Sequence, residues 1–180
     1  MTDDVGLAED LKKAIRQLQA EKMRQYSRRV SIGDLLTDRH DNARAYGWGE
    51  GTTCYDNVLV LGDVKVGSHT WIGPNVILDG SGGTLEIGDY CSIDAGVQIY
   101  THDTVMWAIS GGQVPAEKAS TKIGSAVFVG PNSIITKGVT IGNHVIVGAL
   151  SLVNRDIPSG MKAFGQPAKI VGAVDLRKIA

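Results

Sequence analysis

Histidine is the residue type in this chain best suited to moving a proton near neutral pH, because an imidazole has an ordinary pKa of about 6.5. The chain has four of them: His40, His69, His102 and His144. His102 stands at the start of a stretch, residues 103–122, that interrupts the regular pattern described below and contains Trp107. Ligand-binding residues concentrate on loops carried by a rigid scaffold. We therefore predict that His102 is a general base and that His69 and His144 are solvated.

The spacing of the other reactive residues argues against a metal site or a cysteine nucleophile. The last three histidines are separated by 33 and 42 residues, neither of which is a multiple of one coil of about eighteen residues, and no His-x4-His pair exists, so we expect no bound metal. Cys54 and Cys91 are too few for a disulfide framework, which favours a reduced, cytoplasmic compartment. Asp94 and Asp103 are the two candidates for a carboxylate that orients His102, and the sequence does not choose between them.

An aliphatic residue at every sixth position predicts the scaffold that must hold these residues. The series comprises Val60, Val66, Ile72, Leu78, Ile87, Ile93, Ile99, Ile123, Val129, Ile135, Ile141, Val147 and Val153. Glycine follows seven of these positions, and a small or β-branched residue usually stands four positions on. In an α-helix six residues turn about 600°, which would scatter the aliphatic residues around the axis. Short strands joined at tight corners keep them all on one side.

Three such strands make a triangular coil of about eighteen residues, and parallel pairing between stacked coils satisfies the backbone. The hexads predict about five coils, with glycine providing the backbone conformations that sharp corners need. A β-sandwich is the competing interpretation, but its strands recur every eight to twelve residues around an aromatic core. This chain has 23 glycines and only 2 Phe, 3 Trp and 5 Tyr.

Length and charge limit the remaining possibilities. A chain of 180 residues predicts one domain. With 18 Lys+Arg against 19 Asp+Glu, it has no excess charge that would attract nucleic acid or an anionic membrane surface. No apolar run is long enough for a membrane span. We divide the chain into an amphipathic helix and cap (1–57, with the helix over 7–26), a β-helix (58–172) with an external loop (103–122), and a tail (173–180).

The repeat over residues 58–172 resembles that of the hexapeptide-repeat acyltransferases, which form a left-handed parallel β-helix. The resemblance also rests on Tyr100-Thr101-His102-Asp103 and on Gly165-Gln166-Pro167-Ala168-Lys169-Ile170-Val171. Carbonic anhydrases of the gamma type share the repeat, so it is the closing segment that points to the branch using acetyl-coenzyme A. Within that branch the chain is most similar to bacterial enzymes that O-acetylate sugars, including those of surface polysaccharides.

The resemblance implies an all-β fold and an acetyl-coenzyme A dependent acetyltransferase that acts on a sugar hydroxyl, with His102 as general base and without an acyl-enzyme. It also implies a homotrimer in which the loop 103–122 reaches a neighbouring subunit. The residues expected to contact a sugar or nucleotide-sugar acceptor are Asn75, Asp79, Asp103 and Trp107. Trp107 either stacks on the sugar or packs the loop down.

For the coenzyme, the resemblance implies a groove between parallel coils. The residues expected to contact it are Gly130, Gly148 and Ala149 along the pantetheine arm, and Arg155 and Lys169 near the phosphates. Two other functions stay open: an N-acetyltransferase acting on the amino group of a nucleotide-linked sugar, and a non-catalytic or gamma-anhydrase-like β-helix.

Overall fold

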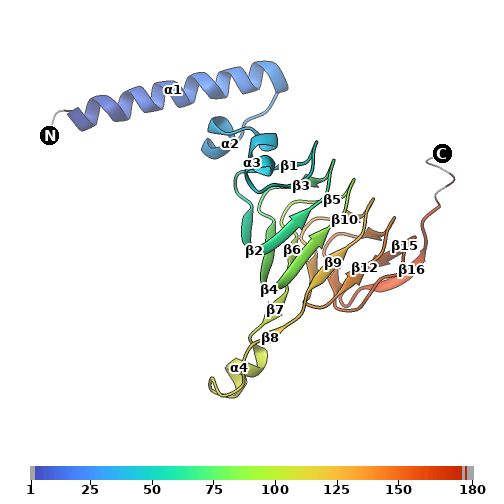
Figure 1. Cartoon of the computed structure of the whole chain (residues 1–180). Coiled ribbons are helices and arrows are strands. Elements are labelled where there is room, and N and C mark those ends of the chain that lie inside the picture. Colours follow the sequence, from blue (N-terminus) through green and yellow to red (C-terminus); the bar gives the residue numbers. More distant parts are fainter. Residues whose placement is uncertain (1–2, 176, 178–180) are drawn as a thin grey trace.

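The computed structural model describes residues 3–175 and 177, and its main body is a three-sided column of stacked coils. Helices occupy one end of the column, a hairpin projects from its side, and the chain leaves at the other end (Figure 1). No helix in the described part of the chain is both long and apolar enough to cross a membrane. The predicted left-handed parallel β-helix with an N-terminal helix and an external loop is confirmed.

The first four coils each contribute one strand, or one part of a long strand, to each of three walls. The first wall contains β1 (Thr53–Cys54), β3 (Trp71–Ile72), β5 (Ser92–Ile93), β10 (Phe128–Val129), β13 (Ile146–Val147) and β15 (Met161–Phe164). The second wall contains the first parts of β2 (Leu59–Val66) and β4 (Ile77–Ile87), then β6 (Gln98–Ile99), β11 (Ile134–Ile135) and β14 (Leu152–Val153). The third wall contains the later parts of β2 and β4, β9 (Thr121–Ile123) and β12 (Thr140–Ile141).

The register confirms the coil of eighteen residues. Thr53 pairs with Trp71 and Phe128 pairs with Ile146, each pair one coil apart and parallel. The first wall has six parallel strands, so the column has about six coils and not the predicted five. The difference arises at the two ends, because β1 and β15 carry no aliphatic hexad signature.

The aliphatic positions of the repeat form the core. All are buried except Val60, which is half-buried. Seven have no exposed surface at all: Ile72, Leu78, Ile93, Ile99, Val129, Ile135 and Val147 are each 0% exposed. The narrow interior explains the shortage of aromatic residues, since each wall is one branched side chain deep.

The glycines that follow the aliphatic positions serve coil stacking and not corner geometry. The expectation that they provide unusual backbone angles is wrong, because Gly73 is not among the residues with positive φ. A Cβ atom at Gly73 would lie 2.9 Å from the amide nitrogen of Ala95 on the next coil. The left-handed conformation falls two residues later, as at Asn75 (φ 58°) and Asn132 (φ 57°), and asparagine tolerates it well.

Three helices precede the column, and the last of them packs on its first strand. They are α1 (Asp3–Tyr26), α2 (Ile32–Leu36) and α3 (Arg39–Ala45). Ser31 and Asp38 cap α2 and α3 with side-chain oxygens. Ala43 and Trp48 are 1% and 7% exposed and join the core, which covers the first coil. Because β1 already belongs to that coil, the β-helix begins inside the segment 1–57 that the sequence assigned to the helix and cap.

Two antiparallel pairs depart from the parallel stack. Strands β7 (His102–Asp103) and β8 (Glu117–Lys118) form the root of the external loop, which carries the short helix α4 (Val105–Ile109). Strand β16 (Lys169–Ala173) folds back on β15 and ends the first wall. Of the predicted tail 173–180, residues 176 and 178–180 lie outside the described residues.

Candidate active site

His102 lies at the corner between the second and third walls, at the root of the hairpin. Its Nδ1 atom is 3.0 Å from Oδ2 of Asp79, which lies at the same corner on the neighbouring coil. The side chain of Asp79 is 3% exposed, whereas that of His102 is 31% exposed. The pair therefore combines a covered carboxylate with an imidazole that is open to solvent on one side.

Neighbouring donors hold the Asp79 carboxylate in place. Its Oδ1 accepts hydrogen bonds from the backbone N–H and the hydroxyl of Ser81, at 2.9 and 2.6 Å. The hydroxyl of Thr101 donates to the backbone carbonyl of Asp79 at 2.8 Å and so joins the two coils. Oδ2 is left to accept the Nδ1–H of His102. In a neutral imidazole this places the proton on Nδ1 and leaves the lone pair on Nε2.

Three extra residues between Leu78 and Ile87 bring Asp79 to this position. The insertion lengthens β4 and passes beside the backbone of the next coil, where Gly82 donates its N–H to the hydroxyl of Thr101 at 2.9 Å. A Cβ atom at Gly82 would lie 2.6 Å from Cβ of His102, so glycine is needed to leave room for this histidine. The residues inserted into the repeat therefore pack directly beside His102, which the sequence did not predict.

Asp79 is the carboxylate that contacts the ring of His102, whereas the sequence left Asp94 and Asp103 as the candidates for this contact. Asp94 lies at a different corner, where its Oδ1 accepts the backbone N–H of Ala95 at 2.8 Å. Asp103 accepts a hydrogen bond from Lys137 at 2.5 Å. The expected contact of Asp79 with the acceptor is corrected as well, because Asp79 is 2% exposed and its carboxylate is occupied by His102 and Ser81.

Lys137 joins both strands of the hairpin to the next coil. Its Nζ atom lies 2.5 Å from Oδ2 of Asp103 and 2.9 Å from Oε2 of Glu117, which face each other across the β7–β8 pair. The hydrogen bond from Lys137 lowers the pKa of Asp103, and the bonds to Asp103 and Glu117 raise the pKa of Lys137. The repeat contains no signal for this contact, since a corner lysine is usually solvated.

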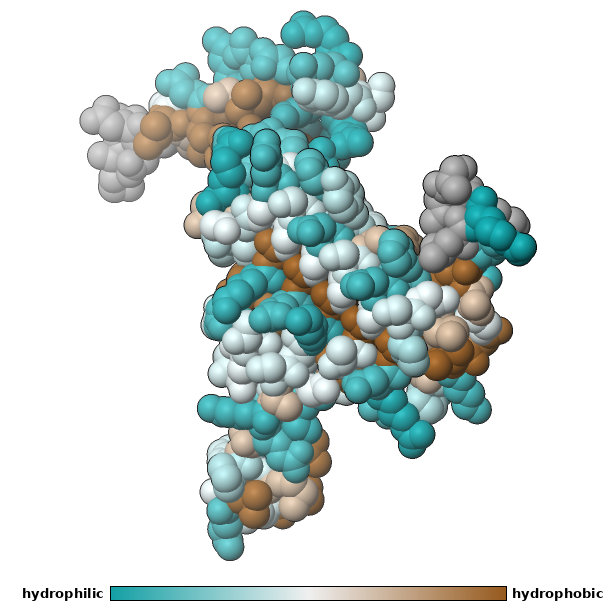
Figure 2. All heavy atoms as spheres, turned by 45° about the vertical axis from the view of Figure 1, so that its right-hand side comes forward, coloured by the Kyte–Doolittle hydropathy of each residue, from teal (hydrophilic) through white to brown (hydrophobic). Residues whose placement is uncertain are grey.

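The hairpin presents apolar residues at its tip. Val105, Trp107 and Ile109 are 59%, 52% and 73% exposed. Figure 2 shows apolar residues on this projection, away from the body of the column. Trp107 partly covers the turn, since its Nε1 lies 3.6 Å from where a Cβ of Gly112 would be. Half of the indole surface stays available to a ligand or to another chain.

The other predicted contact residues fall on two edges of the second wall. Asn75 is exposed at the corner between the first and second walls, where its Oδ1 accepts a hydrogen bond from Asn57 at 2.8 Å. Gly130, Gly148 and Ala149 lie at that same corner on later coils. Arg155 lies at the other edge, which also carries His102. Within one chain, the strands of the second wall separate these two groups.

The predicted coenzyme contacts comprise the buried Gly130, the half-buried Gly148, the exposed Ala149 and two exposed cations. A Cβ atom at Gly130 would lie 2.5 Å from the nitrogen of Ala149, and the ring of Phe164 covers Gly148, so coil packing explains both glycines. Lys169 is exposed on β16, where it pairs with Phe164, and Arg155 is exposed as well. Neither cation forms an ion pair with a residue that the structure describes.

The remaining histidines stand away from this site. His69 and His144 are exposed corner residues with φ of 54° and 55°, and the His69 ring stacks on Tyr90 with 4.9 Å between centroids. His40 belongs to α3. Across the described residues, no group of three or more His, Cys, Asp or Glu side chains is placed to hold a metal ion. Both cysteines are free and buried.

Comparisons with known proteins agree with this architecture. Residues 120–155 match the family described as bacterial transferase hexapeptide (six repeats). Nodulation protein L of Rhizobium meliloti is 38% identical over 118 residues, which cover 61% of this chain and 60% of that protein. The galactoside O-acetyltransferase of Escherichia coli is 26% identical, over 62% of this chain and 64% of the enzyme.

A third relative is an N-acetyltransferase. The 2,3,4,5-tetrahydropyridine-2,6-dicarboxylate N-acetyltransferase of Clostridium perfringens is 39% identical over 67 residues, which are 37% of this chain and 28% of that enzyme. The chain thus spans less than two thirds of the length of each of these relatives.

Solved structures show the same fold. The hexapeptide-repeat acetyltransferase VCA0836 of Vibrio cholerae, complexed with acetyl-coenzyme A, superposes with a TM-score of 0.68 at 23% identity, covering 91% of this chain and 88% of that one. A single-residue mutant of the N-acyltransferase AntD of Bacillus cereus, in complex with dTDP and coenzyme A, gives a TM-score of 0.65 at 24% identity, covering 73% of this chain and 75% of that one. The resemblance to the hexapeptide-repeat acyltransferases is thereby confirmed, and the chain is a left-handed β-helix protein that carries the bacterial transferase hexapeptide repeat.

Proposed function

We propose that this protein is an acyltransferase that moves the acetyl group of acetyl-coenzyme A to a hydroxyl of a sugar, in the synthesis of surface polysaccharide. The observation that carries the proposal is the 3.0 Å contact between His102 and the covered carboxylate of Asp79, at the root of a loop. A cytoplasmic location belongs to the same proposal, in keeping with two free, buried cysteines.

The geometry suits general-base catalysis by His102. Nε2 receives the proton of the acceptor hydroxyl as that oxygen bonds to the acetyl carbon, while Asp79 holds the ring and stabilises the imidazolium. The carbon–sulfur bond then breaks, and the imidazolium returns the proton to the sulfur of the departing thiol. Neither cysteine takes part, since both are buried and their thiol pKa values are raised mainly by burial.

Acetyl-coenzyme A is the proposed donor substrate. The exposed Arg155 and Lys169 have no carboxylate partner in the described part of the chain, so both are available to its phosphates. The backbone around Gly130, Gly148 and Ala149 borders the proposed path of the pantetheine arm. The acetyltransferase of Vibrio cholerae with the same fold was solved with acetyl-coenzyme A.

The acceptor is proposed to lie between His102 and the hairpin. Asp103 and Trp107 extend from the strand that carries His102, and the half-exposed indole offers a flat surface for a sugar ring. Asn75 stands on the opposite edge of the second wall, so it reaches this acceptor only if a second copy of the chain supplies it.

A homotrimer would bring the two edges together. Apart from Gln98, the outward residues of the second wall are apolar, with Leu59 49% and Ile134 36% exposed, whereas the third wall presents Lys65, Glu86 and Lys122. A threefold assembly uses two different patches of each subunit, so one edge of the wall meets the other edge of a neighbour. A fully active monomer in light scattering would contradict this part of the proposal.

A second candidate function is transfer to an amino group of a nucleotide-linked sugar. It is favoured by the structural match to an N-acyltransferase that was solved with dTDP and coenzyme A. An amine that is already deprotonated needs less help from a base. Activity that survives in His102→Ala would therefore favour the amine acceptor over the hydroxyl.

Two measurements test the function. Free sugars, nucleotide sugars and nucleotide-linked amino sugars are screened for release of free thiol from acetyl-coenzyme A. The product is then treated with mild base, which removes an O-acetyl ester and spares an N-acetyl amide. We expect thiol release with a sugar and a base-labile product. A base-stable product would establish the second candidate, and release of no thiol with any acceptor would contradict both.

A further inference from the structure

A cavity at the N-terminal end of the column contains none of the proposed catalytic residues. It lies between the end of α1, the linker to α2, α3 and the first strand of the first wall, and encloses about 260 Å³. Gln19 fixes the linker that forms one side, because its amide donates to the carbonyl of Val30 at 2.6 Å and accepts the N–H of Val30 at 3.4 Å. The cavity is thus built from ordered elements.

Three cations lining this cavity lack a counter-charge. Lys22, Arg28 and Arg39 all face it, and none pairs with a carboxylate among the residues that the structure describes. Two cations without a carboxylate partner would be ordinary on an open surface, but here three converge on one concave site. They leave the guanidinium N–H groups of two arginines available to an anion.

The two carboxylates in the same cavity are already engaged by the backbone or by a hydroxyl. Asp34 is 9% exposed, and its oxygens accept hydrogen bonds from the hydroxyl of Ser31 and the N–H of Asp56, at 3.1 and 3.2 Å. Asp38 accepts the N–H of His40 at 2.8 Å as the cap of α3. Both acids therefore stabilise the local fold, and the cations exceed them by one formal charge.

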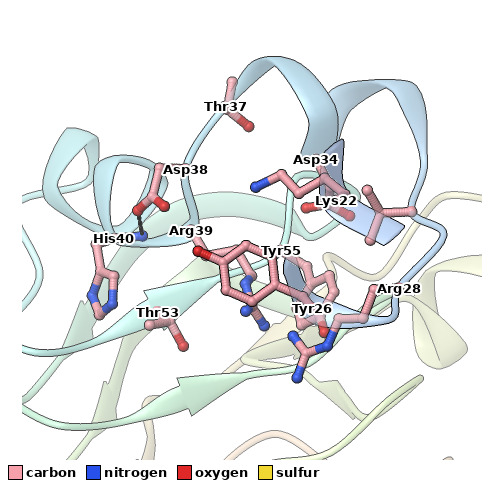
Figure 3. A pocket seen from close by; sticks show the side chains of 11 residues that line it. Lys22, Tyr26, Arg28, Asp34, Thr37, Asp38, Arg39, His40, Thr53 and Tyr55 are labelled. Atoms are coloured by element: carbon pink, nitrogen blue, oxygen red, sulfur yellow. Dashed lines mark hydrogen bonds between the residues drawn. The ribbon is translucent and has the colours of Figure 1, made fainter. Parts of the chain in front are cut away.

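Two aromatic rings complete the lining. The guanidinium of Arg39 lies 4.8 Å from the centroid of the Tyr55 ring, and the ammonium of Lys22 lies 5.4 Å from that of Tyr26. Figure 3 shows both rings in the centre of the cavity, with the ends of Arg28 and Arg39 beside them. Flat rings next to free guanidinium groups suit a ligand that has both a planar ring and an anionic group.

We propose that this cavity binds a nucleoside monophosphate, with the base against Tyr26 and Tyr55 and the phosphate on Arg28 and Arg39. A phosphate presents three acceptor oxygens, which can take several charge-assisted hydrogen bonds from the two guanidinium groups at once. The volume of about 260 Å³ lies just below the usual range of small-ligand pockets, about 300–1,000 Å³, which favours a small ligand.

Calorimetric titration of the full chain with uridine 5′-monophosphate tests this site. Uridine lacks the adenine of coenzyme A, so the donor site does not compete for it. Uridine and inorganic phosphate are titrated separately, so that each tests one part of the nucleotide. We expect the nucleotide to bind at least about tenfold more tightly than uridine or phosphate alone. We also expect its affinity to fall as the salt concentration rises. Absence of nucleotide binding at millimolar concentration, or equal affinity for phosphate alone, would overturn the proposal.

Variants separate this cavity from the proposed active site. Arg28→Gln and Arg39→Gln should each weaken nucleotide binding by at least about tenfold, because each removes a charge-assisted hydrogen bond. Lys12→Gln is the matched control, since Lys12 is an exposed cation of α1 outside the cavity, paired with Glu9. His102→Ala should bind the nucleotide like the wild type.

Two patterns among these variants contradict the assignment. Binding that persists in both arginine variants would place the nucleotide elsewhere. Binding that is lost in His102→Ala would place it in the acceptor site. Thermal unfolding without ligand shows that each variant keeps its fold, and Tyr55→Leu provides a second test of the cavity, with an expected loss of the preference for nucleotide over phosphate.

Discussion

Oδ2 of Asp79 lies 3.0 Å from Nδ1 of His102, although the two residues belong to different coils of the β-helix. The contact depends on the register between β4 and β6 and on the three residues that lengthen the corner after Leu78. It gives the imidazole a fixed orientation before any substrate binds. Such pre-organisation is what a general base requires, since proton transfer depends on geometry first.

The variant Asp79→Asn tests the orienting role. The amide keeps the shape of the carboxylate but does not stabilise an imidazolium, so we expect kcat to fall by at least about tenfold. The KM for acetyl-coenzyme A should stay unchanged, because Asp79 is covered and does not reach that substrate. Asp94→Asn is the matched control, since the carboxylate of Asp94 accepts the N–H of Ala95 at its own corner. Equal rates in the two variants would argue against the pair.

Lys137→Gln should loosen the root of the hairpin. The change removes the charge that bridges Asp103 and Glu117, and we expect faster cleavage by chymotrypsin at Trp107 and a higher KM for the acceptor. Lys122→Gln, which breaks an exposed pair with Glu86, should have no such effect. A protease-resistant hairpin in Lys137→Gln would show that other contacts hold the loop.

The same ion pair predicts a pH range for hairpin protection in the wild type. The hydrogen bond from Lys137 lowers the pKa of Asp103. The stabilisation of the folded hairpin by the Asp103 carboxylate is therefore complete above the ordinary pKa of 3.8 and is lost as pH falls through the lowered pKa. The hydrogen bonds to Asp103 and Glu117 raise the pKa of Lys137. The stabilisation of the folded hairpin by the Lys137 ammonium is therefore complete below the ordinary pKa of 10.5 and is lost as pH rises through the raised pKa. The protection factors of the hairpin amides, which are the exchange rates corrected for the intrinsic rate at each pH, should therefore stay constant near neutral pH.

The thiol of Cys54 should be inert in the folded protein. Burial raises its pKa from 9.0 to about 12, with smaller contributions from Asp34 and Asp56. The folded state therefore keeps its proton between pH 9 and 12 while the unfolded state loses it, so the free energy of unfolding falls as pH rises through this range. In Cys91→Ala at pH 8, we expect a thiol reagent to label Cys54 only after addition of urea. Rapid labelling without urea would contradict the burial.

Adjacent residues on the third wall provide a direct test of the core. Ile141 is 1% exposed and faces the interior, whereas Thr140 points outward. Ile141→Ala should lower the free energy of unfolding by about 2–5 kcal/mol, because it leaves a cavity in a packed interior. Thr140→Ala should change it by about 0.5 kcal/mol or less. Similar midpoints of thermal unfolding for the two variants would mean that the register of this wall is wrong.

The sequence was sufficient to predict the column because its period is local. Each inward aliphatic residue, such as Ile72 or Val129, repeats the environment of the one before it, so a single pattern predicts the walls, the core and the place where the loop leaves. The ends were harder to predict, since β1 and β15 pair with the stack through backbone groups and carry no aliphatic signature. The glycine role was misassigned because crowding between coils depends on spacing along the axis, which no local pattern reports.

The site was predictable only in part. His102 was chosen because it stands where the period breaks, and the structure places it at the root of the hairpin, while its role as a base stays a prediction. The contact of His102 with Asp79 was not predicted, because the two residues lie on neighbouring coils. The insertion that follows Asp79 is visible in the sequence only as an irregular spacing between Leu78 and Ile87. Lys137 was missed for the same reason: its contacts to Asp103 and Glu117 join residues far apart in the chain.

The most direct test compares kcat/KM for thiol release from acetyl-coenzyme A in the wild type and in His102→Ala, with the best sugar acceptor from the screen. His69→Ala serves as the control, since His69 is an exposed corner histidine that stacks on Tyr90. The proposed mechanism predicts a fall of at least about 100-fold for His102→Ala and little change for His69→Ala. Wild-type turnover in a folded His102→Ala variant would contradict the assignment of His102 as the general base.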